Sequence, residues 1–456
     1  MTDSLFIVLA AGEGTRMKSD VPKLLHCVAG RPIISHVVNA AQGAGASEIA
    51  VVVAPDRPQI QKALAADYPQ IVYYEQGEQL GTAHGARMAR ESWQAATGYV
   101  IVVYGDHPLL RAQNFKLVLD KLDAGFDAAI LAFEPKSPEG YGRLITKGAQ
   151  LLAIREHKDA SSSELEISLC NACALAFRTE VFRELIDQVS NNNAQGEYYL
   201  PDLAELANTA GYKVTFAIAA EQDVVGVNSR SQLAYAEALF QQRLREEAMA
   251  KGVTLIDPSS VFLSYDTELG RDVVIEPNVF IGEGVSIGDG AIVHGFSHIV
   301  GAKIGKRASV GPFARLRPDA ILAKDSKVGN FCEVKKAEIG EGAKINHLSY
   351  IGDSFVGAYT NVGAGTITCN YDGVNKHTTR IGRDVFVGSN SSLVAPLAIG
   401  DGAYVASGSV VTRDVEAEAL ALGRSRQENK PGYASRLKAR AQVMKKKANT
   451  ATKENR

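Results

Sequence analysis

A glycine-rich segment near the N-terminus has the composition of a phosphate-binding loop. Residues 9–23, LAAGEGTRMKSDVPK, follow a short apolar run and contain two glycines, Arg16 and Lys23. Glycines let the backbone approach a ligand closely, successive N–H groups line anion pockets, and cationic side chains neutralise phosphate charge. Two common phosphate motifs are excluded: Met17 stands where a dinucleotide fingerprint needs its third glycine, and the segment has no P-loop string. An ordinary strand-to-helix turn with surface charges fits the segment equally well.

Three further residues have side chains suited to chemistry. Asp106 ends the apolar run YVIVVYGD, where a carboxylate could bind a magnesium ion or cap the next helix. Glu156 could accept hydrogen bonds from sugar hydroxyls or could be a surface carboxylate. His347 lies between the apolar positions 345 and 351. A histidine is suited to general-base catalysis near neutral pH, although a lone histidine is more often structural.

Composition indicates an ordinary globular protein. The chain has 456 residues, which predicts two or three domains at roughly 150 residues each. Its net charge of -2 gives no general attraction to nucleic acid or to an anionic membrane. No apolar run approaches the roughly 18 residues of a spanning helix, and the N-terminus lacks the features of a signal peptide.

The cysteines are few and favour a reducing compartment. Their number, five, is odd, which favours free thiols and a cytoplasmic location. Cys170 and Cys173 lie three apart in a strand-like segment, where their side chains should point to opposite faces. No second pair of ligands has a matching spacing, so we expect neither a zinc site nor a redox pair.

The first half of the chain has the pattern of an α/β domain. Within residues 1–228, the apolar runs IVLAAG, EIAVVVA and YVIVVYGD each precede a segment of helical composition. This alternation predicts a doubly wound, Rossmann-like domain with a parallel sheet. Ligands of such sheets bind at the carboxyl ends of the strands, where the glycine-rich segment and Asp106 lie. Residues 229–252, rich in Ala, Leu, Glu, Gln and Arg, predict a long linker helix.

A six-residue period begins at about residue 253. Aliphatic residues recur as in Ile275, Ile281 and Ile287, with occasional slips of phase, to about residue 412. Such a repeat is typical of a parallel β-helix, in which the aliphatic side chains stack inside the coil. The interruption at 368–380 predicts a projecting loop, and such loops often carry function. Residues 434–456 are strongly basic, which predicts a disordered, solvated tail.

Several strings, taken together, resemble known families. After residues 9–23 come EQLGTAHG (78–85), VYGD (103–106), GYGR (140–143), EHKDA (156–160) and NNNAQGEYYLPDL (191–203), in the order found in sugar-phosphate nucleotidyltransferases. The repeat half contains GPFARLRP, GNFCEVKKA, KINHLSYIGD, NVGAGTITCNYDG and VFVGS, and it resembles the left-handed β-helix acyltransferases. Over about residues 4–433, the chain resembles the bacterial family with both N-acetylglucosamine-1-phosphate uridyltransferase and glucosamine-1-phosphate N-acetyltransferase activities.

For residues 1–228 the resemblance implies uridylyl transfer from UTP to N-acetylglucosamine-1-phosphate, with Mg²⁺ as cofactor. A sugar phosphate oxygen would attack the α-phosphorus of UTP while Arg16 and Lys23, as catalytic cations, neutralise charge on the leaving pyrophosphate. The implied magnesium ligands are Asp106 and Asn228. The implied substrate-binding residues are Leu9, Ala10, Ala11 and Gly12 near the nucleotide, Gln76, Gly81 and Thr82 at uracil, and Gly142, Glu156, Asn171 and Asn228 at the amino sugar.

For residues 253–433 the resemblance implies a left-handed β-helix that transfers acetyl from acetyl-coenzyme A to glucosamine-1-phosphate. His347 would be the general base, and Glu333 would orient or support the site. Arg317, Lys335 and Lys376 match sugar-phosphate positions, and Tyr350, Asn361, Asn370 and Tyr371 match sugar-contacting or transition-state positions. Ala364, Ser389, Ser407 and Arg424 match positions around acetyl-coenzyme A.

The resemblance also implies partners and a cellular role. The substrates would be small molecules, with no nucleic acid and no membrane partner, and the family forms homotrimers whose neighbouring subunits complete the acetyltransferase site. Acetylation would come first, because its product is the substrate of uridylyl transfer. The final product, UDP-N-acetylglucosamine, would supply peptidoglycan and lipopolysaccharide precursors.

Two departures from the family pattern and two rival interpretations follow from the same residues. Ser407 stands where we expect alanine, and VVGVNS lacks an expected acidic residue before its glycine and a second Asn after Asn228. One rival is a nucleotidyltransferase whose β-helix only forms the trimer, which the KINHLSY string and the long loop oppose. The other is a binding or scaffold protein without turnover, which the presence of Lys23 and Asp106 opposes.

Overall fold

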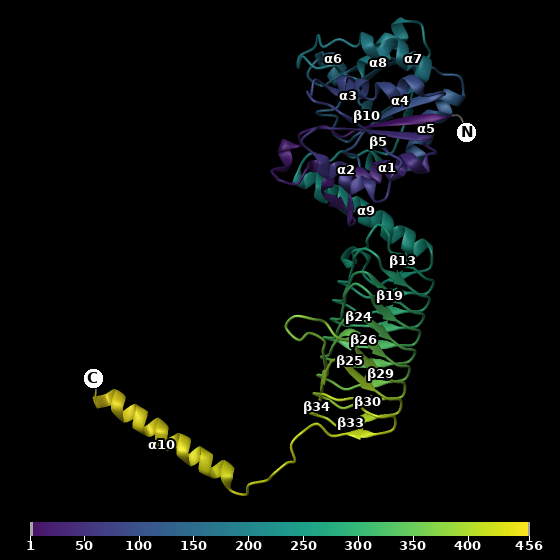
Figure 1. The fold of residues 1–456 in the computed structure, drawn as a ribbon. Coiled ribbons are helices and arrows are strands. Elements are labelled where there is room, and N and C mark those ends of the chain that lie inside the picture. The colour runs from purple at the N-terminus through teal and green to yellow at the C-terminus, as the bar shows by residue number, and fades with distance from the viewer. Residues whose placement is uncertain (1–2, 455–456) are drawn as a thin grey trace. The chain divides into compact units, whose positions relative to one another are not determined.

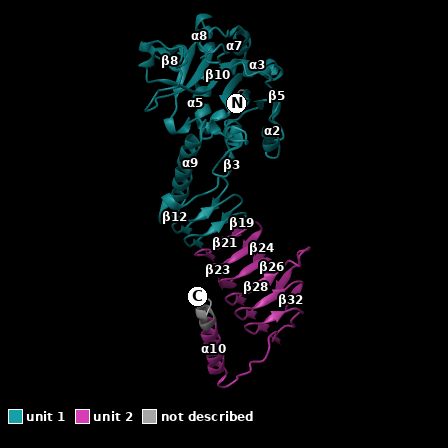
Figure 2. Ribbon diagram, turned by 90° about the vertical axis from the view of Figure 1, so that its left-hand side faces the viewer, with its two compact units in different colours: residues 1–302 teal, residues 303–456 magenta. Residues whose placement is uncertain are grey.

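The computed structural model of the chain describes residues 3–454. It divides the chain into two compact units, residues 1–302 and 303–456 (Figures 1 and 2). The first unit contains an α/β domain, a long helix and a short run of hexapeptide strands. The second contains further hexapeptide strands and a C-terminal helix.

A nine-stranded sheet forms the centre of the α/β domain, with the order β11-β7-β10-β6-β1-β4-β5 and a hairpin of β8 and β9 beside β10. The pairs β1–β4, β1–β6, β4–β5 and β7–β11 are parallel, as predicted, but β10 runs antiparallel to both of its neighbours in the main order. The chain enters β10 after a hairpin instead of a helical crossover, which reverses its direction. The strands are β1 (Ser4–Leu9), β4 (Glu48–Val53), β5 (Val72–Glu75), β6 (Tyr99–Tyr104), β7 (Ala128–Phe133), β8 (Arg143–Lys147), β9 (Gln150–Arg155), β10 (Cys170–Arg178) and β11 (Val214–Ile218), with a separate hairpin of β2 (Cys27–Val28) and β3 (Arg31–Pro32).

Helices cover both faces of this sheet. Side chains alternate along β1, so that Phe6 and Val8 belong to one hydrophobic cluster and Leu5 and Ile7 to the other. This confirms the predicted doubly wound arrangement, which is visible in Figure 1. The helices of the domain are α1 (Ile33–Gly43), α2 (Pro58–Ala65), α3 (Thr82–Met88), α4 (Arg90–Ala95), α5 (Ala112–Asp123), α6 (Ser162–Leu165), α7 (Thr179–Leu185) and α8 (Asp202–Thr209).

The predicted linker helix is α9 (Arg230–Ala250), and Ser229 caps its first turn by accepting from the Gln232 backbone N–H. A buried carboxylate fixes this helix to the α/β domain. Asp223 accepts from Arg243 of α9 at 3.1 Å and from Arg111 at 2.7 Å. At the other side of α9, the Gln241 amide bonds both the backbone N–H and the carbonyl of Leu263 in the first hexapeptide strands.

The hexapeptide strands are short and pair in parallel, as in the predicted parallel β-helix. In residues 303–456 one column of aliphatic side chains runs through consecutive coils: Val310, Val328, Ile345, Val362, Val387 and Val405, each buried. Burial of this column confirms the six-residue pattern. Residues such as Asp325, Leu348 and Tyr359 adopt positive φ at the corners, where the chain turns between strands.

The bounds of the hexapeptide strands are as follows. In the first unit they are β12 (Thr254–Leu255), β13 (Glu268–Leu269), β14 (Val274–Ile275), β15 (Phe280–Ile281), β16 (Ser286–Ile287), β17 (Ile292–Val293) and β18 (His298–Ile299). From Ala302 onward they are β19 (Ala302–Ile304), β20 (Ser309–Val310), β21 (Arg315–Leu316), β22 (Ala320–Leu322), β23 (Lys327–Asn330), β24 (Glu333–Ile339), β25 (Lys344–His347), β26 (Tyr350–Val356), β27 (Asn361–Val362), β28 (Ile367–Cys369), β29 (Thr379–Ile381), β30 (Phe386–Val387), β31 (Ser392–Val394), β32 (Leu397–Ile399), β33 (Tyr404–Val405), β34 (Val410–Val411) and β35 (Leu420–Ala421).

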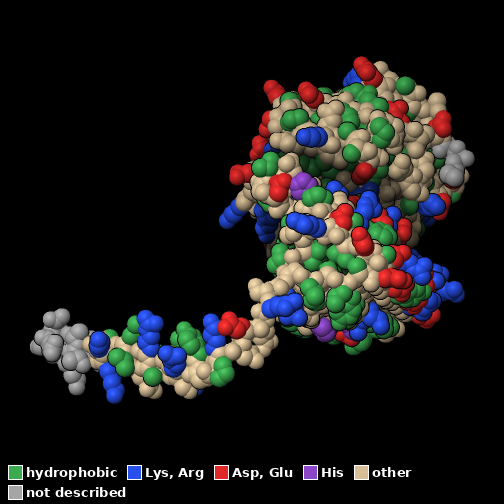
Figure 3. Space-filling view, turned by 60° about the horizontal axis from the view of Figure 1, so that its bottom comes forward, with side chains coloured by type: hydrophobic (Ala, Val, Ile, Leu, Met, Phe, Trp, Pro, Cys, Tyr) green, Lys and Arg blue, Asp and Glu red, His purple; other side chains and the backbone are tan. Residues whose placement is uncertain are grey.

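Two segments leave the regular coil. Residues 370–378 form the predicted projecting loop, closed by an antiparallel bridge between Tyr371 and Lys376 (Figure 1). The basic tail was predicted to be disordered; the structure instead has a helix, α10 (Tyr433–Glu454). Ala, Lys, Arg, Gln and Met are good helix formers, which explains the helix. All described side chains from Tyr433 onward are exposed, and Lys and Arg side chains are spread along α10 (Figure 3).

The cysteines are all free, as predicted. Cys170 and Cys173 nevertheless lie in the same hydrophobic cluster, whereas a regular strand would place them on opposite faces. A register shift in β10 between Asn171 and Leu175 accounts for the difference. No helix among the described residues combines the length and the apolar composition needed to cross a membrane.

Candidate active sites

Two adjoining cavities open at the carboxyl ends of β1 and β6 in the α/β domain. The first has a volume of about 310 Å³, and the second has a volume of about 440 Å³. The two share four residues along their border: Thr82, Tyr104, Asp106 and Glu197. This is the edge of the sheet at which the sequence predicted a ligand site.

All of the N-terminal site residues predicted from the sequence line one of these cavities. The first cavity is lined by Leu9, Ala10, Ala11, Gly12, Lys23, Gln76, Gly81, Thr82 and Asp106. The second is lined by Arg16, Thr82, Asp106, Gly142, Glu156, Asn171 and Asn228. Sequence reasoning did not single out Tyr104, His107, Glu197 or Tyr199, which also line them, although His107 and the pair Glu197 and Tyr199 lie within or beside recognised strings.

Three side chains from distant parts of the chain meet at the cavity border. Lys23 Nζ donates to Asp106 Oδ2 at 2.6 Å and to Asn228 Oδ1 at 3.0 Å. His107 Nδ1 lies 2.8 Å from the other carboxylate oxygen of Asp106. Burial alone would raise the pKa of Asp106, but His107 and Lys23 outweigh it and hold the pKa well below its usual range. The carboxylate is therefore ionised, and two oxygens converge on one position occupied by a cation.

The glycines of the phosphate loop have a specific structural reason. Gly14 has a φ of 67°, and a Cβ atom there would lie 2.6 Å from the Cβ of Lys23. A side chain at position 14 would therefore displace Lys23 from Asp106. The loop continues into a short 3-10 helix, Thr15–Met17, and not directly into α1. This leaves the backbone of residues 10–14 free of helical hydrogen bonds and facing the first cavity.

Gln76 lies at the wall of the first cavity and is almost fully buried. Its Nε2 donates to the Gly81 carbonyl at 3.2 Å and lies 3.1 Å from His84 Nδ1. Gly81 has a φ of 114°, and a Cβ atom there would lie 2.6 Å from the carbonyl oxygen of Tyr198. The turn at residue 81 therefore requires glycine, and its carbonyl holds the amide of Gln76 in one orientation.

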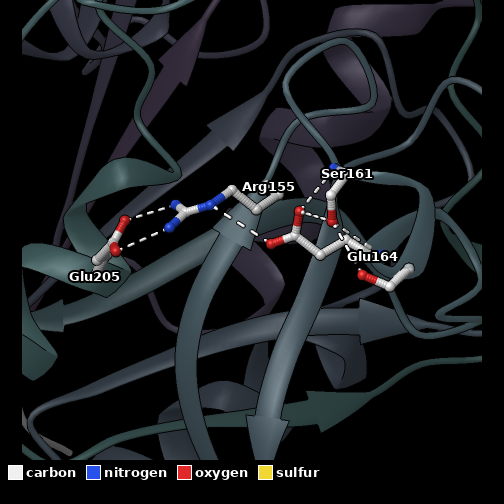
Figure 4. A network of polar contacts seen from close by, with 5 residues as sticks. Arg155, Ser161, Glu164 and Glu205 are labelled. Atoms are coloured by element: carbon white, nitrogen blue, oxygen red, sulfur yellow. Dashed lines mark hydrogen bonds and ion pairs between the residues drawn. The ribbon is translucent and has the colours of Figure 1, made fainter.

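Glu156 is the acidic residue of the second cavity. Burial, together with the nearby charges of Asp202 and Asp159, raises the pKa of Glu156 to about 7. Its neighbour Arg155 fixes the end of β9 by a bidentate pair with Glu205 at 2.6 and 2.9 Å and by a longer contact to Glu164 (Figure 4). Glu164 in turn forms a capping box with Ser161 at the start of α6. Glu156 therefore lies on a rigid backbone.

The predicted acetyltransferase residues lie on successive coils of the second unit. His347 ends β25, and its Nδ1 lies 2.7 Å from Oδ1 of Asn330, which ends the neighbouring strand β23. Glu333, predicted to orient or support the site, accepts from Arg317 at 2.8 Å and lies 3.7 Å from Arg315. The direct contact to His347 is thus made by Asn330, which sequence reasoning missed. Asn330 precedes His347 by 17 residues, close to one coil, so the period of the repeat was the available signal.

The sugar-phosphate residues form a cationic group. Lys335, on β24, and Lys376, on the projecting loop, lie close enough that Lys335 lowers the pKa of Lys376. Two lysines held this close favour an anion between them. Beneath them, the buried carboxylate of Asp353 accepts from the side-chain amide of Asn370 and lies 3.7 Å from Lys336. Asp353 is a second residue that sequence reasoning missed.

The projecting loop has its own internal support. Asp372 accepts from the backbone N–H groups of Val374 and Asn375 and from His377 Nε2. These hydrogen bonds hold the pKa of Asp372 well below its usual range. The loop that carries Tyr371 and Lys376 is therefore closed by a fixed carboxylate turn, although its side chains are largely exposed.

The predicted coenzyme residues follow one another along the coils. The Ala364 carbonyl accepts from Asn390 N–H, the Ser389 carbonyl accepts from Gly408 N–H, and Arg424 lies near Gly408. Ser407, which replaces an expected alanine, lies against Gly388. Tyr350 pairs in register with Glu333, and Asn361 pairs with Lys344. Among the described residues, no group of three or more His, Cys, Asp or Glu side chains could hold a metal ion.

Comparison with known proteins gives two family matches and many full-length relatives. Residues 6–192 match the MobA-like NTP transferase domain, and residues 266–301 and 378–413 match the bacterial transferase hexapeptide family. A protein of Agrobacterium fabrum named "Bifunctional protein GlmU" is 52% identical over 97% of this chain and 98% of its own length. Proteins with the same name from Bartonella quintana and Zymomonas mobilis are 47% and 46% identical, over 96% and 95% of this chain and 98% and 97% of their own lengths.

Proposed function

The chain belongs to the family of bifunctional GlmU proteins, and from this premise we propose how its own residues divide the two reactions. It is a bifunctional transferase of UDP-N-acetylglucosamine synthesis, with a nucleotidyltransferase domain and a hexapeptide acetyltransferase domain. We assign residues 1–228 to uridylyl transfer, 229–252 to a linker helix, 253–433 to acetyl transfer and 434–456 to a basic tail.

Acetyl transfer is the first reaction. The amine of glucosamine-1-phosphate attacks the thioester carbonyl carbon of acetyl-coenzyme A, the carbon–sulfur bond breaks, and coenzyme A leaves as its thiol. His347 accepts the proton that the amine loses. Lys335 and Lys376 bind the sugar phosphate, and the proximity of their two positive charges supports this assignment. Arg317, held by Glu333, supplies a further cation.

Uridylyl transfer is the second reaction. An oxygen of N-acetylglucosamine-1-phosphate attacks the α-phosphorus of UTP, and pyrophosphate leaves. We place the nucleotide in the first cavity and the amino sugar in the second. The observation that carries this proposal is their shared border at Asp106, Thr82 and Tyr104, where the two reactants would meet. Positioning and charge neutralisation by Arg16 and Lys23 then supply the catalysis.

We propose Mg²⁺ as the cofactor of this second reaction, held by Asp106 and Asn228. The two side-chain oxygens already converge on one cationic position, that of Lys23 Nζ. One carboxylate and one amide oxygen are a donor set typical for Mg²⁺, which takes its other ligands from phosphates and water. When bound, the ion would neutralise phosphate charge.

We further propose that the protein is a cytoplasmic homotrimer. The five free thiols support a reducing compartment. The hexapeptide unit exposes apolar side chains beside the acetyltransferase residues: Leu348 follows His347 and is 62% exposed, and Phe331 is 54% exposed and stacks on Phe313. Side chains of this kind are suited to burial between subunits.

Product analysis by mass spectrometry tests the whole assignment. The purified chain is incubated with glucosamine-1-phosphate, acetyl-coenzyme A, UTP and Mg²⁺. UDP-N-acetylglucosamine is the expected product. Acetylated sugar phosphate alone would contradict the uridylyl assignment. Uridylylation of supplied N-acetylglucosamine-1-phosphate without acetylation would reduce the β-helix to an assembly domain.

A further inference from the structure

The structure places an uncharged acceptor directly beside the proposed general base. Strands β23 and β25 pair in parallel, with Asn330 in register with His347. Asn330 Oδ1 lies 2.7 Å from His347 Nδ1, and the Asn330 backbone carbonyl accepts from Leu348 N–H at 3.0 Å. The two residues are therefore held together by both backbone and side chain.

This contact decides which nitrogen of His347 is basic. A side-chain amide oxygen accepts hydrogen bonds and cannot donate them. In the neutral imidazole, Nδ1 must therefore carry the hydrogen, and the lone pair lies on Nε2. When Nε2 takes a proton, Nδ1–H continues to donate to Asn330, so the same hydrogen bond persists before and after proton transfer.

The other polar groups near this pair do not replace Asn330. The charged residues on β23 and β25 are Lys327 and Lys344, which pair with each other in register at the opposite end of the strands. The neighbouring strand β27 contributes Asn361, and the Gly365 N–H donates to the His347 carbonyl at 3.2 Å. The nearby carboxylate of Glu333 is bound to Arg317.

We propose that Asn330 is a positioning residue for acetyl transfer, which holds His347 with its Nε2 free to accept the proton of the substrate amine. The amine nitrogen forms the new bond to the acetyl carbon, the bond to sulfur breaks, and the amine proton passes to Nε2. Asn330 gains and loses no proton. This inference rests on the proposed role of His347.

The test compares Asn330→Ala and Asn330→Asp in the full-length chain, with acetyl transfer measured as kcat, KM and the pH profile of kcat/KM. Loss of one hydrogen bond in Asn330→Ala should lower kcat about 2- to 12-fold and leave KM for glucosamine-1-phosphate unchanged. Asn330→Asp keeps an acceptor and adds a charge. It should retain activity at alkaline pH and move the acid limb of the profile up by about one pH unit.

Two controls separate positioning from folding. Lys327→Ala changes an exposed side chain on the same strand and should leave acetyl transfer unchanged. Uridylyl transfer by the same preparations should stay at its wild-type rate. If Asn330→Ala also lowers uridylyl transfer or thermal stability, the nearly isosteric Asn330→Asp decides the question.

The inference is overturned if Asn330→Ala has wild-type kcat. It is also overturned if Asn330→Asp loses as much activity as Asn330→Ala with an unshifted acid limb. Failure of the proposed function would look different, because the wild-type chain itself would then not acetylate glucosamine-1-phosphate.

Discussion

His347 and Asp106 belong to different halves of the chain and to different chemistries, so their substitutions should separate the two activities. We expect His347→Ala to lower acetyl transfer by about 10²- to 10⁴-fold, because a general base is lost, and to leave uridylyl transfer unchanged. Asp106→Ala should abolish uridylyl transfer and spare acetyl transfer, because Lys23 and Asn228 lose the charge that they converge on. Separate assays with glucosamine-1-phosphate and with N-acetylglucosamine-1-phosphate measure this. Loss of both activities in either variant would contradict two independent sites.

Glu156 predicts a pH-dependent stability. Burial raises its pKa from an ordinary value of 4.5 to about 7 in the folded chain. A raised acid pKa means that the folded state binds the proton more tightly, so stability falls as the pH rises from about 4.5 to about 7. Glu156→Gln removes the charge and should increase the free energy of unfolding by about 1–3 kcal/mol at pH 8, but little at pH 4.5.

Thermal unfolding of substrate-free protein at the two pH values measures this difference. Glu166→Gln, an exposed neighbour, is the matched control and should show no pH-dependent gain. A Glu156→Gln gain that is equal at both pH values would show that shape, and not charge, causes it.

At the scale of single elements, α9 depends on one buried carboxylate. Asp223 is 2% exposed and pairs with Arg111 and Arg243. Removing one partner of a buried ion pair leaves the other charges uncompensated, which costs about 3–5 kcal/mol. Asp223→Ala should therefore destabilise the α/β domain by about 3 kcal/mol in urea unfolding. Asp120→Ala, an exposed acid on α5, should change stability by less than about 0.5 kcal/mol.

The regular elements could be predicted from the sequence, because their signals are periodic. The six-residue repeat identified the buried column from Val310 to Val405, and the alanine- and leucine-rich segment after residue 228 identified α9. The antiparallel direction of β10 was missed, because strand direction depends on the preceding hairpin and not on the strand's own residues. The helix α10 was missed because its high charge outweighed its helical propensity in the prediction.

The candidate sites were predicted less completely than the elements. Residues within recognised strings, such as Gln76 and Gly142, do line the two cavities. Asn330 and Asp353 were missed, because each acts through a partner 17 residues away, and such a pairing appears only when one coil is stacked on the next. The same holds for Lys23, whose contact with Asn228 spans most of the α/β domain.

For the whole molecule, the exposed apolar side chains beside His347 predict that assembly and acetyl transfer are linked. Leu348→Glu places a charge on a residue that is 62% exposed. If neighbouring subunits complete the site, this change should reduce the assembly to monomers and lower acetyl transfer at least about tenfold, since a buried unpaired charge is costly, while uridylyl transfer continues. Light scattering coupled to size exclusion, with both assays, measures these effects.

Ile218→Glu is the matched control, because Ile218 is 55% exposed on the edge strand β11 of the α/β domain. It should alter neither assembly nor acetyl transfer. A trimeric Leu348→Glu protein with full acetyl transfer would contradict the proposed role of this surface.

The buried column of the β-helix has a consequence for how such a protein changes over evolution. Successive members of the column from Val310 onward are 17 or 18 residues apart, but 25 residues separate Val362 from Val387, and the additional residues form the projecting loop with Tyr371 and Lys376. The hexapeptide region thus behaves like a text with a reading frame. A deletion of one residue within a strand turns every later aliphatic side chain outward, whereas an insertion at a corner leaves the frame intact. New recognition chemistry can therefore be acquired one corner at a time.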